Sequence, residues 1–97
     1  MPKINLSDIE QSLTSLLQEL RRREGETIDL GPVDYYWAIP PADLYAPYQA
    51  PSHLTLGQLS DDIEEISRVA QSQAPPVGLD LVKLSAVLAA IGHRAVW

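Results

Sequence analysis

The chain has 97 residues, of which 45% are hydrophobic and 21% charged, and its formal net charge at pH 7 is -6. This length predicts one domain spanning residues 1–97, and the hydrophobic content excludes a disordered chain. The chain has no cysteine, which excludes disulfides, zinc–thiolate sites, iron–sulfur clusters and cysteine nucleophiles. It lacks both a long apolar stretch and the pattern of a secretory signal, so we expect no membrane contact and a cytoplasmic location.

The charged residues are unevenly distributed along the chain. Residues 24–67 contain nine acidic side chains and no Lys or Arg. The single basic cluster, Arg21–Arg23, is followed at once by Glu24 and Glu26. Because nucleic-acid binding requires cations that neutralise phosphates, we expect no nucleic-acid partner. We expect the arginines to lie in the last turn of a helix, at the negative end of its dipole.

The first predicted helix follows a stripe of hydrophobic residues spaced three or four positions apart: Leu6, Ile9, Leu13, Leu16, Leu17 and Leu20. Its start has two candidates, which are Asn5 as an N-cap and Ser7 with Glu10 as a capping box. The helix is expected to end near Glu24, with Gly25 terminating it.

A short β-hairpin or strand is predicted after this helix. Hydrophobic and polar residues alternate from Val33 to Ile39, and Ile28 and Leu30 alternate as well. The Gly31-Pro32 pair could turn the chain between these two runs. Prolines at positions 40, 41, 47 and 51 then predict an extended or turned loop.

A second amphipathic helix is predicted from the stripe Leu56, Leu59, Ile63, Ile66 and Ala70. We prefer a start at Thr55, because Leu56 and Leu59 already lie on the stripe. A later start at Ser60 is the alternative, and the helix must end before Pro75.

A third helix, capped by Asp80 and ended by Gly92, is predicted from Leu81, Leu84, Leu88 and Ile91. It is apolar nearly all round, which favours a homodimer in a chain this short. The sequence therefore predicts a mainly α fold, with three amphipathic helices, a short β-hairpin or strand and a proline-rich aromatic loop. The alternative is an α+β fold with a fuller sheet.

Aromatic residues gather in the predicted strand and loop, where five of the six lie between Tyr35 and Tyr48. All five carry a polar group, which suits surfaces that are partly apolar and partly wet. Tyr35 and Trp37 share a face that we expect to cover the helices, whereas Tyr36 faces the other way. We predict partner contacts for Tyr36, Trp37, Tyr45 and Tyr48.

An acidic run, Asp61-Asp62-Ile63-Glu64-Glu65, lies on the second predicted helix. Its like charges repel at helical spacing, which favours a solvated face, a basic partner that contacts Asp61, Asp62 and Glu65, or a divalent metal. All-helical nucleotide pyrophosphatases place acidic pairs on two helices around Mg²⁺, whereas only one helix carries such a run here. We predict no metal site and no cofactor.

No catalytic residue is predicted. Ser52, His53 and Asp61 could be drawn as a triad, but we expect adjacent residues not to point at each other as a triad requires. A strand–turn–helix nucleophile elbow and a phosphate-binding glycine loop are both missing from the sequence.

Two segments resemble a small family of uncharacterised bacterial proteins: Asp34–Pro40 with the following Leu44-Tyr45, and Leu54–Asp62. The family shares a DYYW-x-IP segment and an LT-[IL]-GQLSDD segment, and the resemblance spans about Asp34 to Glu65. It implies no catalytic residue. It implies that the aromatic strand, the loop and the start of the second helix form one unit. The residues themselves agree with this, because Gly57 lets a neighbouring backbone or ring approach the first turn of that helix, and we expect a Tyr or Trp of the loop there.

These observations favour a non-enzymatic interaction protein over an enzyme. A small acidic protein can cover a basic active site and associate quickly by charge steering, as an immunity or antitoxin-like protein does. The alternatives are an Mg²⁺-dependent nucleotide hydrolase assembled as an oligomer and a purely structural homo-oligomeric subunit.

Overall fold

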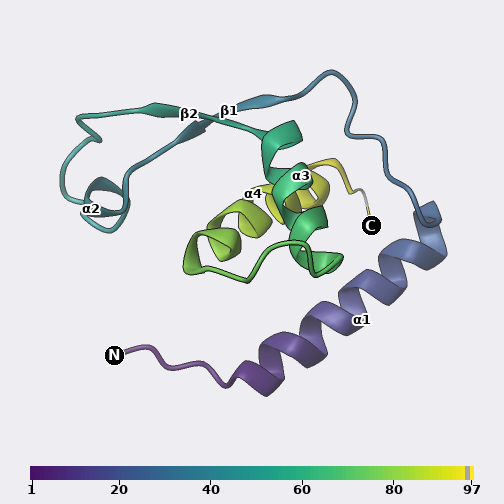
Figure 1. Ribbon diagram of the computed structural model, residues 1–97. Helices are drawn as coiled ribbons and strands as arrows, with labels where there is room; N and C mark the ends of the chain where they lie inside the picture. Colours follow the sequence, from purple (N-terminus) through teal and green to yellow (C-terminus); the bar gives the residue numbers. More distant parts are fainter. Residues whose placement is uncertain (96) are drawn as a thin grey trace.

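The protein is described by a computed structural model, which covers residues 1–95 and residue 97. Helices make up 54% of the chain and the sheet has two strands, which confirms the predicted mainly α fold with a small β part. In chain order the elements are α1 (Leu6–Glu24), β1 (Tyr35–Ala38), α2 (Pro41–Leu44), β2 (Thr55–Gln58), α3 (Leu59–Ala70) and α4 (Gly78–Arg94), as Figure 1 shows.

Helix α1 begins and ends where the sequence predicts. Of the two candidate caps it uses Asn5, whose side-chain oxygen accepts a hydrogen bond from the backbone N–H of Ser7 at 2.9 Å. At the other end the chain leaves the helix at Gly25, which has a φ of 84° that other residues rarely adopt.

The hairpin forms, but with a different second strand from the predicted one. Gly31 does turn the chain, at φ 74°, and its N–H is bound by the Asp29 side chain. Ile28 and Leu30 nevertheless lie outside any strand, so the predicted pairing of this run was wrong. Strand β1 instead pairs antiparallel with β2, in a register that places Tyr36 opposite Gly57 and Trp37 opposite Leu56.

The preferred start of the second helix was therefore also wrong. Thr55 to Gln58 form strand β2, and α3 begins at Leu59, close to the alternative start at Ser60. The local sequence pattern is compatible with a helix and with a strand, and pairing with β1 makes this segment a strand. The backbone N–H of Leu59 extends this pairing by donating to the carbonyl oxygen of Asp34 at 2.7 Å.

Helix α4 begins earlier and ends later than predicted. It starts at Gly78, and the carboxylate of Asp80, three residues after the Val77 N-cap, accepts the N–H of Val77 at 2.9 Å. Asp80 thus binds back to the cap rather than being the cap. Gly92 does not end the helix, since Ala95 still donates its N–H to the carbonyl of Ile91.

Helices α3 and α4 pack closely on each other, whereas α1 lies beside them and approaches them little (Figure 1). Among the described residues, the buried hydrophobic side chains are Leu20 and Leu59. The radius of gyration is 15.1 Å, compared with about 12.5 Å for a compact domain of this length. The single chain is therefore an open arrangement with very little core. No helix of the described part combines the length and apolar character needed to cross a membrane.

Candidate functional site

The junction between the hairpin and α3 is held by a hydrogen bond from Tyr36 to Asp62. The phenol of Tyr36 donates to Oδ2 of Asp62 over 2.6 Å, and Asp62 is only 5% exposed. Burial, together with the neighbouring carboxylate, raises the pKa of Tyr36 to about 12. The phenol therefore stays protonated and keeps donating throughout the neutral range.

Gly57 makes room for a ring, but the ring is that of Tyr36 in β1 and not of a Tyr or Trp in the loop, and Gly57 lies in strand β2 rather than in the first turn of a helix. A Cβ built on Gly57 would overlap ring atoms of Tyr36, which lies opposite it on the neighbouring strand. The ring therefore covers the glycine and reaches across β2 to α3. A side chain at position 57 would displace the ring and weaken its bond with Asp62.

Asp34, the residue just before β1, caps α3. Its carboxylate accepts the backbone N–H of Ser60 at 2.8 Å and the side-chain amide of Gln58 at 2.8 Å. These bonds, the one from Gln58 first, lower the pKa of Asp34. Ser60 lies in the first turn of α3, so Asp34 does the work of an N-cap residue although it is 26 residues away in sequence.

The outer face of the hairpin exposes three large side chains, which we call the aromatic platform: Tyr35, Trp37 and Leu56, at 64%, 68% and 65% exposure. The expectation that Tyr35 and Trp37 cover the helices was wrong, and so was the outward direction expected for Tyr36. The cause is Gly57, because it opens the opposite face of the hairpin to the Tyr36 ring.

The loop that connects the two strands carries two further exposed tyrosines. After the short helix α2, Tyr45 is 81% exposed and Tyr48 is 98% exposed. Figure 1 shows this loop extending well away from the packed helices α3 and α4. Both rings are accessible in the single chain.

The acidic run does not form one continuous acidic face. Asp61 is exposed, but Asp62 is buried and bound to Tyr36, which corrects the expectation of an open Asp62. Glu64 and Glu65 both bind Arg68, at 2.6 and 3.2 Å. The described residues include no group of three or more His, Cys, Asp or Glu side chains that could hold a metal ion. Tyr36 and Arg68 thus partner three of the four acidic residues of the run.

Ser52 and His53 lie within hydrogen-bond distance of each other although they are adjacent in the sequence. The hydroxyl of Ser52 lies 3.1 Å from Nδ1 of His53 and donates to Oδ2 of Asp43 at 3.4 Å. A triad needs the acid on the second nitrogen of the imidazole, whereas here the acid contacts the serine. All three residues lie around the proline-rich loop, and this arrangement does not activate Ser52.

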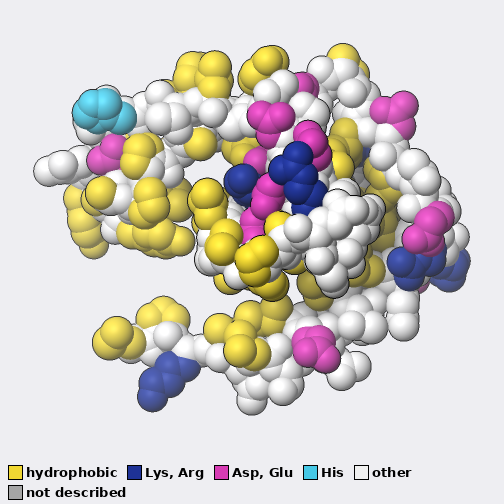
Figure 2. Space-filling model, viewed as in Figure 1, with side chains coloured by type: hydrophobic (Ala, Val, Ile, Leu, Met, Phe, Trp, Pro, Cys, Tyr) yellow, Lys and Arg dark blue, Asp and Glu magenta, His cyan; other side chains and the backbone are white. Residues whose placement is uncertain are grey.

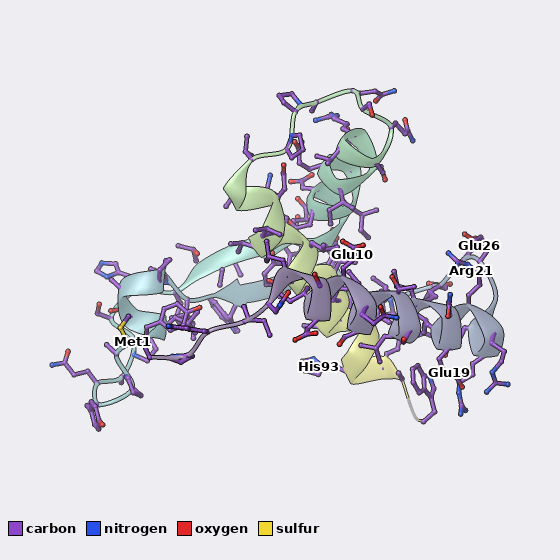
Figure 3. All side chains as sticks on the ribbon, turned by 90° about the horizontal axis from the view of Figure 1, so that it is seen from below. Met1, Glu10, Glu19, Arg21, Glu26 and His93 are labelled. Carbon is purple, nitrogen blue, oxygen red and sulfur yellow. The ribbon has the colours of Figure 1, made fainter. Side chains whose placement is uncertain are left out.

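The arginines at the end of α1 bind acids of their own chain. Arg22 and Arg23 bind Glu19, and Arg21 binds Glu26. Hydrogen bonds from Arg22 and then Arg23 lower the pKa of Glu19 to about 2. Figure 3 shows Glu10 and Glu19 at well-separated places along α1, so they form no acidic pair.

An open groove separates the first half of α1 from α4. It has a volume of about 430 Å³, and its walls are mostly apolar: Ile4, Ile9, Leu13 and Leu16 on one side and Leu81, Leu84 and Leu88 on the other, with the polar residues Asp8 and Ser12 on α1 and Ser85 on α4. Figure 2 shows hydrophobic side chains on both sides of the space between α1 and the body of the molecule. The groove closes towards Leu20, beyond which Glu24 lies 3.8 Å from Arg94 and Arg23 lies over the Trp97 ring.

The sequence did not identify Asp34 as a residue of the junction, nor Tyr35 and Leu56 as residues of the exposed surface. The alternation from Val33 to Ile39 did place Tyr35 with Trp37, but it could not tell which face of the strand would be covered. Searches among protein families, curated proteins and solved structures found no match for this chain.

Proposed function

We propose that this chain is a non-enzymatic protein-interaction module of the bacterial cytoplasm, and that it binds a basic protein partner through the aromatic platform. The observation that carries the proposal is the exposure of Tyr35, Trp37 and Leu56 on a two-stranded sheet. Exposed aromatic residues that lie together mark interaction surfaces, because their burial contributes much of the binding energy. An immunity or antitoxin-like role is one specific form of this proposal.

The backbone of β1 supports the same surface. The bond from Leu59 to Asp34 makes the pairs of Tyr36 with Gly57 and of Ala38 with Thr55 the hydrogen-bonded ones in the ladder. The backbone N–H and C=O groups of Tyr35 and Trp37 therefore point away from β2. A partner can bind both this open strand edge and the side chains of the platform.

Charge supports a basic partner rather than an acidic one. Residues 24–67 include the whole hairpin and its loop and contain nine acidic residues and no basic one. Tyr45, Tyr48 and Asp61 are exposed on the same segment and extend the contact that we propose. The other residues predicted to contact the partner are Tyr36, Asp62 and Glu65. They support the proposed contact indirectly, through the Tyr36–Asp62 bond and the Glu65–Arg68 pair within the chain.

The test is capture of partners from a lysate of the native host by the wild type and by two matched variants. The Trp37→Ala variant removes the platform's largest ring, and the Leu79→Ala variant removes an exposed apolar side chain on α4, remote from the platform in sequence. We expect one near-stoichiometric basic protein that is released by salt, kept by Leu79→Ala and lost with Trp37→Ala. Binding that neither salt nor Trp37→Ala weakens would contradict the proposal.

A homodimer is the second part of the proposal, and the exposed area of the chain favours it. The accessible surface is 8039 Å², compared with about 5,500 Å² for a compact monomer of this mass. The excess of about 2,500 Å² per chain is of the size that obligate homodimers bury. Sedimentation equilibrium tests this part, with a mass of twice 10.7 kDa as the expected result and the single-chain mass as the contradicting one.

A further inference from the structure

The hydrophobic stripe of α1 has the spacing of a coiled-coil seam. Its residues Leu6, Ile9, Leu13, Leu16 and Leu20 follow each other at alternating distances of three and four positions. This repeat lets side chains of one helix fit between those of a neighbouring helix along the whole seam. The stripe of α4, formed by Leu81, Leu84, Leu88 and Ile91, has the same spacing.

Only one end of the α1 seam is covered within the chain. Leu20, near the end of α1, is 9% exposed, whereas Leu16 is 56% exposed and Leu6 is 77% exposed. On α4, Leu81 faces the open end of the groove and is 72% exposed. The two helices therefore meet at one end and leave the seams of both uncovered at the other.

A second α1 helix matches this open end. It carries the required three-and-four spacing, and its own first half is uncovered in the same way. If each copy places the first half of its α1 in the groove of the other copy, both grooves are filled and both helices are covered, as two-fold symmetry requires. The excess surface of about 2,500 Å² per chain is enough for an interface of this kind.

We infer that the groove between α1 and α4 holds the α1 helix of a second copy of this chain, so that two copies form a four-helix bundle from both α1 and both α4 helices. This inference rests on the homodimer proposed above and assigns its interface. In the bundle, Ile9, Leu13 and Leu16 of one copy pack against Leu81, Leu84 and Leu88 of the other. Helices α3 and the hairpins stay outside, which leaves both aromatic platforms free.

Matched charge substitutions on α1 test the assignment. In Leu16→Glu the new carboxylate enters the groove, whereas in Gln18→Glu it lies on the opposite side of the same helix. By sedimentation equilibrium we expect the wild type and Gln18→Glu to be dimers and Leu16→Glu to be monomeric, with dimer affinity reduced by at least about a hundredfold. Circular dichroism reports whether Leu16→Glu keeps its helices.

Cysteine cross-linking gives a second readout that does not depend on a disruptive substitution. The natural chain has no cysteine, so each introduced one reports on its own position. Ser12→Cys, which lines the groove, should form disulfide-linked dimers at dilute protein, and Gln18→Cys should form few. The Ser12→Cys/Ser85→Cys double variant tests closure within one chain, because a closed groove would give a disulfide at monomer mass.

The outcomes separate this inference from the proposed dimer. A monomeric wild type would overturn both. A dimeric wild type would keep the dimer and overturn the groove assignment if Leu16→Glu also stayed dimeric and Ser12→Cys cross-linked no more than Gln18→Cys. An intrachain disulfide in the double variant, with no linked dimer from Ser12→Cys, would likewise overturn the assignment. Monomeric Leu16→Glu that keeps its helices, with cross-linked Ser12→Cys, would support it.

Discussion

The junction between the hairpin and α3 differs from the groove between α1 and α4 in how far its side chains have partners within the chain. At the junction, a few specific contacts join distant residues: Tyr36 to Asp62, Asp34 to Ser60, and the Tyr36 ring to Gly57. At the groove, two long helices with regular hydrophobic stripes leave most of the α1 stripe and the beginning of the α4 stripe exposed. A strong helical pattern therefore specifies a helix and its apolar face, but not what covers that face.

The largest effect is expected at the Tyr36–Asp62 bond. Tyr36→Phe keeps the ring over Gly57 but leaves the buried Asp62 without its donor. We expect the free energy of unfolding to fall by about 1–3 kcal/mol, measured by urea denaturation. The matched control is Tyr48→Phe, which changes a fully exposed ring and should have almost no effect. Equal stability of both variants would mean that the bond does not hold the junction.

The next effect concerns the fit between Gly57 and the ring. Gly57→Ala places a methyl group where the Tyr36 ring lies, so we expect a loss of about 1–2 kcal/mol from crowding. In the background of Tyr36→Ala the same substitution should cost much less, because the ring is gone. A double-mutant cycle of these two changes measures the coupling. Additive losses would show that the ring and the glycine do not interact.

Alkaline pH should weaken the junction through Tyr36. Its pKa in the folded chain is raised from 10.0 to about 12, so the folded state holds the phenol proton more tightly than the unfolded state. This contribution to stability is fully present below about pH 10 and is lost as the pH rises towards 12. Urea denaturation at several pH values should show this loss in the wild type. The loss should be smaller in Tyr36→Phe, and an identical pH dependence of the two proteins would contradict the assignment.

The smallest effect of the series is expected at Asp34, on the acid side. Its pKa is lowered by bonds from Gln58 and Ser60, so the ionised form is favoured in the folded state. Its contribution is present above the ordinary Asp pKa and is lost as the pH falls through the lowered value. Asp34→Ala should therefore destabilise the protein at neutral pH, and the difference from the wild type should shrink in acid. A difference that stays constant with pH would argue against the carboxylate as the cap of α3.

Local signals predicted the elements well where one residue decides the outcome. Asn5 and Gly25 lie at the two ends of α1. Both were identifiable from the sequence, because capping side chains and positive φ have clear residue preferences. The sequence also indicated a close approach at Gly57, and a ring does lie there, although it belongs to Tyr36 of the strand and not to the loop. In each of these cases the controlling interaction is local or needs only one partner.

Errors arose where distant residues compete with a local pattern. Thr55 to Gln58 fit a helix start, but pairing with Tyr35 to Ala38 makes them a strand. Asp34 looked like one of several acids in a strand, and its role as the cap of α3 depends on the antiparallel register. The facing of Tyr35 and Trp37 was wrong for the same reason, because the choice of covered face depends on Gly57 across the sheet.

One chain leaves its core unfinished, and we propose that a second copy completes it. Urea denaturation of the wild type over about a hundredfold range of protein concentration tests this claim most directly. We expect a midpoint that rises with concentration, since each tenfold increase adds about 1.4 kcal/mol to the stability of a dimer that unfolds to single chains. A midpoint that stays constant over this range, in a protein of single-chain mass, would contradict it.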